Sequence, residues 1–237
     1  MRQFMDGTIV QAMRLRKVYR GANDVEALRG IDIEVERGEM VAIVGPSGSG
    51  KTTLLNCLSG LDAFDGGKVI VDGQDLSAMS DRARTAYRRD HMGFVFQAFN
   101  LLPVLSAVEN VEIPLLLQNV DSRNSRRRAL EMLETLGLAH RANHRPDQLS
   151  GGEQQRVAVA RALVHQPAVV WADEPTGNLD TEVTQVIVEL LVRMNKDGQT
   201  IVLVTHNPQV AERARRTLRM RDGRIEVAGA ERAAAAR

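Results

Sequence analysis

Gly45-Pro46-Ser47-Gly48-Ser49-Gly50-Lys51-Thr52 matches the phosphate-binding pattern G-x-x-x-x-G-K-[ST] at every fixed position. Residues 40–44 before it are apolar and typical of a strand, and residues 53–58 after it are apolar at helical spacing. The glycines allow backbone N–H groups to face a phosphate, Lys51 adds a full charge, and Thr52 offers a hydroxyl to Mg²⁺. The alternative is a glycine-rich turn before a helix, but the strand–loop–helix context favours a phosphate site.

The composition is that of an ordinary globular protein and identifies no partner. The chain has 237 residues, with 31 Lys and Arg against 30 Asp and Glu, which fits one domain with subdomains. Aromatic residues make up only 3%, which argues against a stacking surface for single-stranded nucleic acid. The single cysteine, Cys57, excludes an internal disulfide and is expected to be a small core side chain rather than a nucleophile.

The chain shows no apolar segment that would insert into a membrane. Residues 1–11 lack the apolar core of a secretory signal, and no uninterrupted apolar run approaches the length that spans a bilayer. We therefore expect the protein in the cytosol or on the cytosolic side of a membrane.

The N-terminal part predicts an antiparallel sheet. Residues 9–19 and 25–35 alternate apolar and polar side chains, and residues 66–73 form a further short strand between turns. A polar helix is expected through residues 82–89. Tyr19, one of only two tyrosines, either packs on this sheet or stacks on adenine beside the phosphate loop.

Three apolar strands are each followed by polar side chains. These are residues 93–96 followed by Gln97, residues 169–172 followed by Asp173 and Glu174, and residues 200–205 followed by His206. In a parallel sheet such side chains meet at the edge where ligands bind. Alternation along the strand allows one of the two carboxylates to serve Mg²⁺ and the other to serve water. His206 alone would also fit a core histidine at a strand end.

The middle and the end of the chain are mainly helical. Residues 98–144 show a helical pattern that we expect Pro103 and Pro114 to break, and the basic run 122–128 is interpreted as a solvated helix face, with contact to anionic lipid or nucleic acid as the alternative. An amphipathic helix is expected over 182–194. A hairpin around Asp222-Gly223 and a disordered Ala/Arg-rich tail over 228–237 complete the chain.

A second glycine-containing helix start follows residue 149. Leu149-Ser150-Gly151-Gly152-Glu153 opens a helix that is expected to run to Pro167, and Ser150 and Glu153 have the spacing of a capping box. The plain interpretation is a well-capped helix. The two glycines also leave backbone N–H groups unobstructed, as a second phosphate-binding site would require.

These motifs, in this order, resemble the nucleotide-binding subunit of an ATP-binding cassette (ABC) transporter over about residues 8–227. Residues 93–97, 100–103, 109–111 and 173–180 resemble the branch of lipoprotein-releasing, macrolide-export and cell-division ATPases. The resemblance implies an α/β fold: a P-loop NTPase (RecA-like) core with an N-terminal antiparallel β subdomain and a helical subdomain inserted at about 98–165.

The resemblance also implies a role for each matching residue, with ATP and Mg²⁺ as the ligands. The catalytic residues would be Lys51, Gln97, Glu174 and His206. The metal would be held by Thr52, Gln97 and Asp173. The nucleotide would be bound by Tyr19, Gly45, Pro46, Ser47, Gly48, Ser49, Gly50, Lys51, Thr52, Thr53, Ser150, Gly151, Gly152, Glu153 and Asp180.

One phosphate loop and one Leu-Ser-Gly-Gly string imply a head-to-tail homodimer around two ATP molecules, driving a separate membrane permease. The favoured function is export or extraction of lipoprotein, lipid, peptide or drug. The first alternative is an ATPase that regulates a membrane protein in cell division without transport. The second is a soluble ATPase acting on nucleic acid or the ribosome, disfavoured by the near-neutral charge, so that no nucleic acid partner is expected.

Overall fold

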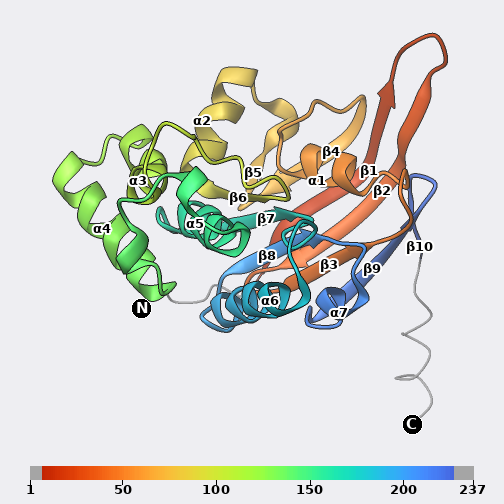
Figure 1. Ribbon diagram of the computed structural model, residues 1–237. Coiled ribbons are helices and arrows are strands. Elements are labelled where there is room, and N and C mark those ends of the chain that lie inside the picture. Colours follow the sequence, from red (N-terminus) through yellow and green to blue (C-terminus); the bar gives the residue numbers. More distant parts are fainter. Residues whose placement is uncertain (1–6, 227–237) are drawn as a thin grey trace.

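The computed structural model describes residues 7–226, and its central element is a six-stranded sheet in the order β10-β9-β3-β8-β7-β6 (Figure 1). Strands β9, β3, β8, β7 and β6 run parallel, and β10 pairs antiparallel with β9. The strands are β3 Met40–Val44, β6 Met92–Phe96, β7 Val169–Asp173, β8 Thr200–Val204, β9 Arg216–Arg221 and β10 Arg224–Glu226.

The inner strands of this sheet are buried because both of their faces are covered. Short runs of consecutive apolar residues are typical of parallel strands with helices or another sheet on each side. In β3, Ala42 packs in one hydrophobic cluster, while its neighbours Val41 and Ile43 pack in another. The period of two along the strand thus divides the core into two halves.

A second sheet is antiparallel, as the alternating pattern predicts, and has the order β2-β1-β4-β5. Its strands are β1 Thr8–Tyr19, β2 Val25–Glu36, β4 Gly66–Val71 and β5 Gln74–Asp75. The β1–β2 hairpin pairs Tyr19 with Val25 next to its connecting loop, residues 20–24, so these two residues lie opposite one another on neighbouring strands.

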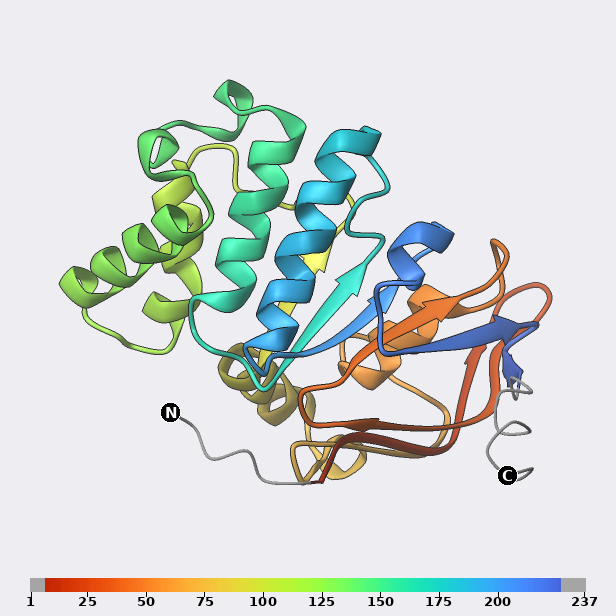
Figure 2. The ribbon, with the colours of Figure 1, turned by 90° about the horizontal axis from the view of Figure 1, so that it is seen from below.

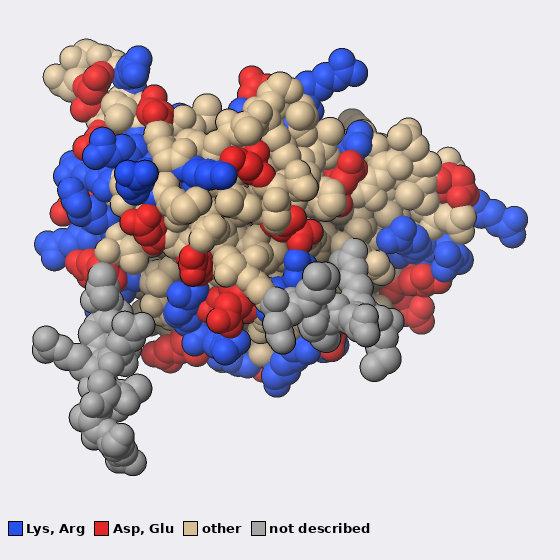
Figure 3. Space-filling model, turned by 180° about the vertical axis from the view of Figure 1, so that it is seen from behind, with Lys and Arg blue, Asp and Glu red and all other residues tan. Residues whose placement is uncertain are grey.

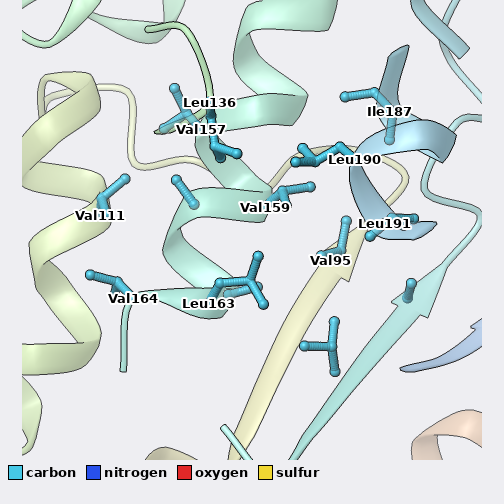
Figure 4. Packing of buried hydrophobic residues seen from close by; sticks show 14 of the residues in the cluster. Val95, Val111, Leu136, Val157, Val159, Leu163, Val164, Ile187, Leu190 and Leu191 are labelled. Carbon is cyan, nitrogen blue, oxygen red and sulfur yellow. The ribbon is translucent and has the colours of Figure 1, made fainter. Parts of the chain in front are cut away.

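The helices cover the six-stranded sheet from both sides (Figure 2). They are α1 Lys51–Leu58, α2 Asp81–His91, α3 Ala107–Leu117, α4 Ser122–Thr135, α5 Gly151–Leu163, α6 Thr181–Lys196 and α7 Pro208–Ala211. One cluster joins the sheet to α3–α6, with Val95, Val159 and Leu191 among its members (Figure 4). The other encloses α1 between the two sheets.

Two expectations about the helices are wrong. Pro114 does not end the helix but lies inside α3. The burial of Val111 and Leu115 in the core stabilises α3 by more than the loss of one backbone hydrogen bond at the proline destabilises it. The helix that opens at Gly151 ends at Leu163 rather than Pro167, because Gln166 turns the chain with φ 55°. The predicted α/β fold, with its antiparallel sheet and its helices between β6 and β7, is confirmed.

The surface mixes both signs of charge. Figure 3 shows Lys and Arg interspersed with Asp and Glu over most of the face that it presents. In the basic run of α4, Arg126 pairs with Glu112 and Arg127 with Glu131. Within residues 7–226, none of the helices has the length and apolar character needed to cross a membrane. The predicted tail over 228–237 lies outside the described residues.

Candidate functional site

Helix α1 begins without a side-chain cap. Its N-cap residue, Gly50, is left-handed with φ 99° and provides no capping side chain, so the first backbone N–H groups of the helix have no such partner among the described residues. A Cβ atom on Gly50 would come within 2.6 Å of the Ala27 carbonyl oxygen, so only glycine fits there. The adjacent Ser49 Oγ is buried and makes no hydrogen bond to the described residues. Unpartnered donors at a helix N-terminus are what an anionic ligand requires.

A cavity of about 690 Å³ lies over this helix start. It brings together side chains far apart in the sequence, since the carboxyl ends of β7 and β8 meet α1 at one edge of the sheet. The lining residues are Tyr19, Val25, Glu26, Ala27, Arg29, Ser47, Gly48, Gly50, Lys51, Thr52, Thr53, Glu174, His206, Asp222 and Gly223. Its volume lies in the range of small-molecule sites.

Three side chains in or beside the cavity provide one cation, Lys51, and two groups with oxygen atoms, Thr52 and Asp173. The Lys51 ammonium donates to the carbonyl oxygens of Gly45 and Pro46 at 2.9 and 3.0 Å, so it lies at the loop. The Thr52 hydroxyl donates to Asp173 Oδ1 at 3.1 Å. Burial raises the pKa of Asp173, while the Thr52 hydrogen bond acts in the opposite direction. A hydroxyl and a carboxylate side by side suit a magnesium ion, which binds oxygen ligands and commonly one or two carboxylates.

Glu174 has an unusual backbone conformation for a residue with a large side chain. Its φ is 46°, and its N–H donates to the Val204 carbonyl oxygen at 2.9 Å. Its carboxylate lies 2.9 Å from His206 Nδ1 and accepts from the His206 backbone N–H at 3.3 Å. Non-glycine residues in the left-handed region are strained by about 1 kcal/mol or more, and Glu174 is one of eight such residues in the described chain.

Gln97 is not among the residues that line the cavity. Its amide nitrogen donates to Asn178 Oδ1 at 3.1 Å, and the Asn178 amide nitrogen donates back to the Gln97 carbonyl oxygen at 3.0 Å. The Asn178 side chain therefore bonds both the side-chain amide and the backbone carbonyl of Gln97, and it joins the end of β6 to the turn before α6. No pattern in the sequence indicated this contact between Gln97 and Asn178.

The second predicted phosphate site lies away from the cavity. Ser150 and Glu153 form the expected capping box at the start of α5, and the Glu153 carboxylate also binds Arg141 Nε at 2.9 Å. None of residues 150–153 lines the cavity. Asp180, also predicted to bind nucleotide, caps α6 by accepting from the Val183 N–H at 2.8 Å. Among the described residues, the predicted phosphate-binding groups therefore meet at the α1 cavity, and residues 150–153 and Asp180 are not part of its lining.

The structure adds cavity residues that the sequence analysis missed. Arg29 comes from β2, and Gly223 comes from the turn between β9 and β10; the Gly223 N–H donates to the Ser49 carbonyl oxygen at 3.1 Å. Only Val25 had a usable signal in the sequence, because antiparallel pairing of the predicted strands 9–19 and 25–35 across the loop 20–24 brings it opposite Tyr19. Cys57 is buried, and burial raises its pKa to about 12, as expected for a core thiol.

Comparison with known proteins identifies the family. The ABC transporter family model matches residues 28–177. An uncharacterized ABC transporter ATP-binding protein of Thermotoga maritima is 49% identical over 92% of this chain and 94% of its own length. The lipoprotein-releasing system ATP-binding protein LolD of Bordetella pertussis is 49% identical over 93% of this chain and 96% of its own length.

A solved structure agrees with the sequence comparisons. The ATP-binding cassette MJ0796, in a dimeric post-hydrolysis state bound to ADP and Pi, superimposes with a TM-score of 0.85 and 43% identity over 92% of this chain and 97% of that one. The fold, the phosphate loop with its cavity and these relatives lead to one conclusion. The chain belongs to the ABC transporter family, among its ATP-binding subunits.

Proposed function

We propose that the chain is a Mg²⁺-dependent ATPase that works as a head-to-tail homodimer and drives a separate membrane permease. The observation that carries the proposal is the convergence of Lys51, Thr52, Glu174 and His206 on one cavity, with Asp173 bonded to Thr52. ATP-binding subunits of the ABC transporter family hydrolyse ATP. The dependence on Mg²⁺ and the role of each residue in the site are what we propose.

The reaction is attack of water on the γ-phosphorus, which breaks the bond to the bridging oxygen and releases ADP and phosphate. Such a transfer needs mainly positioning and neutralisation of charge. Lys51 and the loop N–H groups hold the β- and γ-phosphates. Glu174 accepts a hydrogen bond from the attacking water and aligns it. His206, 2.9 Å from Glu174, holds that carboxylate and faces the γ-phosphate.

Thr52 and Asp173 are the residues that would hold Mg²⁺, whose charge offsets that of the β- and γ-phosphate oxygens. Gln97 would be a further ligand, through its amide oxygen. Tyr19, an exposed residue of the cavity lining, stacks on the adenine ring.

The homodimer follows from the incomplete set of phosphate contacts in one chain. Residues 150–153 do not line the cavity, so they would reach the γ-phosphate bound to a second copy, and Asp180 would lie at the same interface. The dimeric form of MJ0796 supports this arrangement.

The partner and the cargo are proposed from the relatives. LolD is the ATP-binding protein of a lipoprotein-releasing system. This supports a chain that lies on the cytosolic face of a membrane, bound to an integral-membrane permease, with a lipoprotein, lipid, peptide or drug as cargo. Recovery of a multi-span membrane protein with the ATP-held chain, from membranes of its native host, tests this. Recovery of ribosomes or nucleic acid instead would contradict it.

The test of the chemistry is Glu174→Gln. We expect phosphate release to fall by roughly 10²–10⁴-fold, the usual contribution of a positioned acid or base, while ATP-bound dimers accumulate in light scattering. Glu189→Gln, an exposed carboxylate on α6, is the matched control and should hydrolyse ATP normally. Normal turnover in Glu174→Gln would overturn the role given to Glu174.

A further inference from the structure

Asp62 connects two side chains of β1 to the end of α1. Its Oδ1 accepts from the Lys17 ammonium at 2.9 Å, and its Oδ2 accepts from the Tyr19 hydroxyl at 2.9 Å. The Asp62 N–H donates to the Asn56 carbonyl oxygen in α1 at 3.1 Å. The carboxylate is therefore anchored to the helix that carries the phosphate loop.

Lys17 covers one face of the Tyr19 ring. Its ammonium lies 4.9 Å from the ring centroid, within the range of a cation–π contact. It also donates to the Ala63 carbonyl oxygen at 2.5 Å, and Lys17 as a whole is only 9% exposed. The cation is thus held on that face and does not swing into solvent.

The other face of the same ring is open. Tyr19 is 43% exposed and lines the cavity over α1. Its hydroxyl is held at the ring edge by Asp62, with Thr53 Oγ1 at 3.4 Å as a further partner. A ring fixed at its edge and covered on one side presents a single flat surface to the cavity.

The charges of this group are stable near neutral pH. Although burial alone would raise it, the hydrogen bonds from Lys17 and Tyr19 bring the pKa of Asp62 below its ordinary value. Burial raises the pKa of Tyr19, so the phenol remains a donor. The carboxylate and both of its donors therefore keep the protonation states that the three contacts require.

We propose that Asp62, together with Lys17, is a positioning residue for nucleotide binding: the pair holds the Tyr19 ring in the orientation in which its open face receives the base. The inference rests on the proposed ATPase function and on stacking at Tyr19. Orienting the ring before binding removes the cost of ordering an exposed side chain when ATP arrives.

The test separates base binding from phosphate binding. In steady-state hydrolysis, the KM for ATP reports both, whereas the inhibition constant of tripolyphosphate, which has no base, reports the phosphate contacts alone. Stacking on an aromatic ring is worth about 1–3 kcal/mol per base, that is, an effect of about 5- to 150-fold on binding. We expect Asp62→Ala to raise the KM by about five- to tenfold and to leave both kcat and the tripolyphosphate constant within about twofold.

Two further variants sharpen this result. Asp62→Asn keeps an oxygen acceptor for the phenol but loses the ion pair with Lys17, so its KM should be intermediate; being isosteric, it also carries the test if Asp62→Ala does not fold. Asp75→Ala is the matched control, because Asp75 pairs with Lys68 at 3.0 Å and contacts neither Lys17 nor Tyr19. Its KM should equal that of the wild type.

The outcomes are distinguishable. An unchanged KM in Asp62→Ala, or equal weakening of ATP and tripolyphosphate, overturns the positioning role. If Tyr19→Ala leaves the ratio of the KM for ATP to the inhibition constant of tripolyphosphate unchanged, the base does not stack on Tyr19 and the proposed base site is wrong. In the Tyr19→Phe background, which lacks the hydroxyl, the effect of Asp62→Ala should shrink; an undiminished effect would also contradict the proposal.

Discussion

Two glycine-rich helix starts in this chain have opposite local chemistry. Helix α1 begins at a left-handed Gly50 with no side-chain cap, beneath a cavity of about 690 Å³. Helix α5 begins with Ser150 and Glu153 satisfying one another's backbone N–H groups, and the contact with Arg141 holds the Glu153 carboxylate in place.

The difference shows which helix start is built for a ligand inside this chain. Uncapped donors at α1 remain available to a phosphate, and the macrodipole favours the added negative charge. At α5 the capping box uses the N–H groups of Ser150 and Glu153, and none of residues 150–153 lines the cavity of the same chain. A glycine-rich string is therefore not by itself evidence for a phosphate site within the same chain.

The largest expected effect is at α1. Lys51→Ala removes the cation that neutralises the phosphates, and we expect the hydrolysis rate to fall by roughly 10²–10³-fold. Lys68→Ala, which removes a lysine paired with Asp75, is the control and should keep its rate. Phosphate release measures both. A Lys51→Ala chain that hydrolyses ATP at the normal rate would mean that α1 is not the reactive site.

The next largest effect is a loss of stability when Gly50, at the start of α1, is replaced. Gly50→Ala places a Cβ atom within 2.6 Å of the Ala27 carbonyl oxygen, in addition to its left-handed strain. We expect the free energy of unfolding to fall by about 2 kcal/mol or more, as measured in urea. Gly48→Ala shares the left-handed φ but meets nothing within 4 Å, so it should lose only about 1 kcal/mol. Equal losses would contradict the steric argument.

At α5 the expected loss of stability is smaller. Ser150→Ala removes the N-cap and should lower the free energy of unfolding by about 1 kcal/mol. Ser106→Ala removes the equivalent cap of α3, which also has a capping box, and should cost a similar amount. Only Ser150→Ala should also slow hydrolysis, because only this helix start is proposed to meet the partner's nucleotide. Equal hydrolysis rates in Ser150→Ala and Ser106→Ala would contradict the proposal that the start of α5 contacts the nucleotide of a second copy.

The smallest effect is a pH dependence at α5. The backbone hydrogen bond from Ser150 holds the pKa of Glu153 below its usual value. A lowered pKa contributes stability above the unfolded value of 4.5, and this contribution is lost as the pH falls through the folded value. In urea unfolding at pH 7, the free energy of unfolding of the wild type should therefore exceed that of Glu153→Gln by about 0.3–1 kcal/mol. The two values should converge as the pH falls below the folded pKa. A difference independent of pH would contradict this.

The sequence predicted most elements because their patterns are local. The consecutive apolar residues of β3 and the alternation in β1 identify strands without any tertiary contact. Pro114 was misjudged because the burial of α3 in the core, invisible in the sequence, outweighs the lost hydrogen bond. The end of α5 was placed too late because the left-handed turn at Gln166 has no glycine to mark it.

The sequence by itself determined the kinds of group at the site: a glycine loop with Lys51, oxygen ligands at Thr52 and Asp173, and a carboxylate beside them. Their chemistry belongs to the residue types and their order along the chain. Only the tertiary structure decided which groups meet. The contacts of Gln97 with Asn178 and of Asp62 with Tyr19 join residues 81 and 43 positions apart, and such distances close only when the strands and helices pack around a common core.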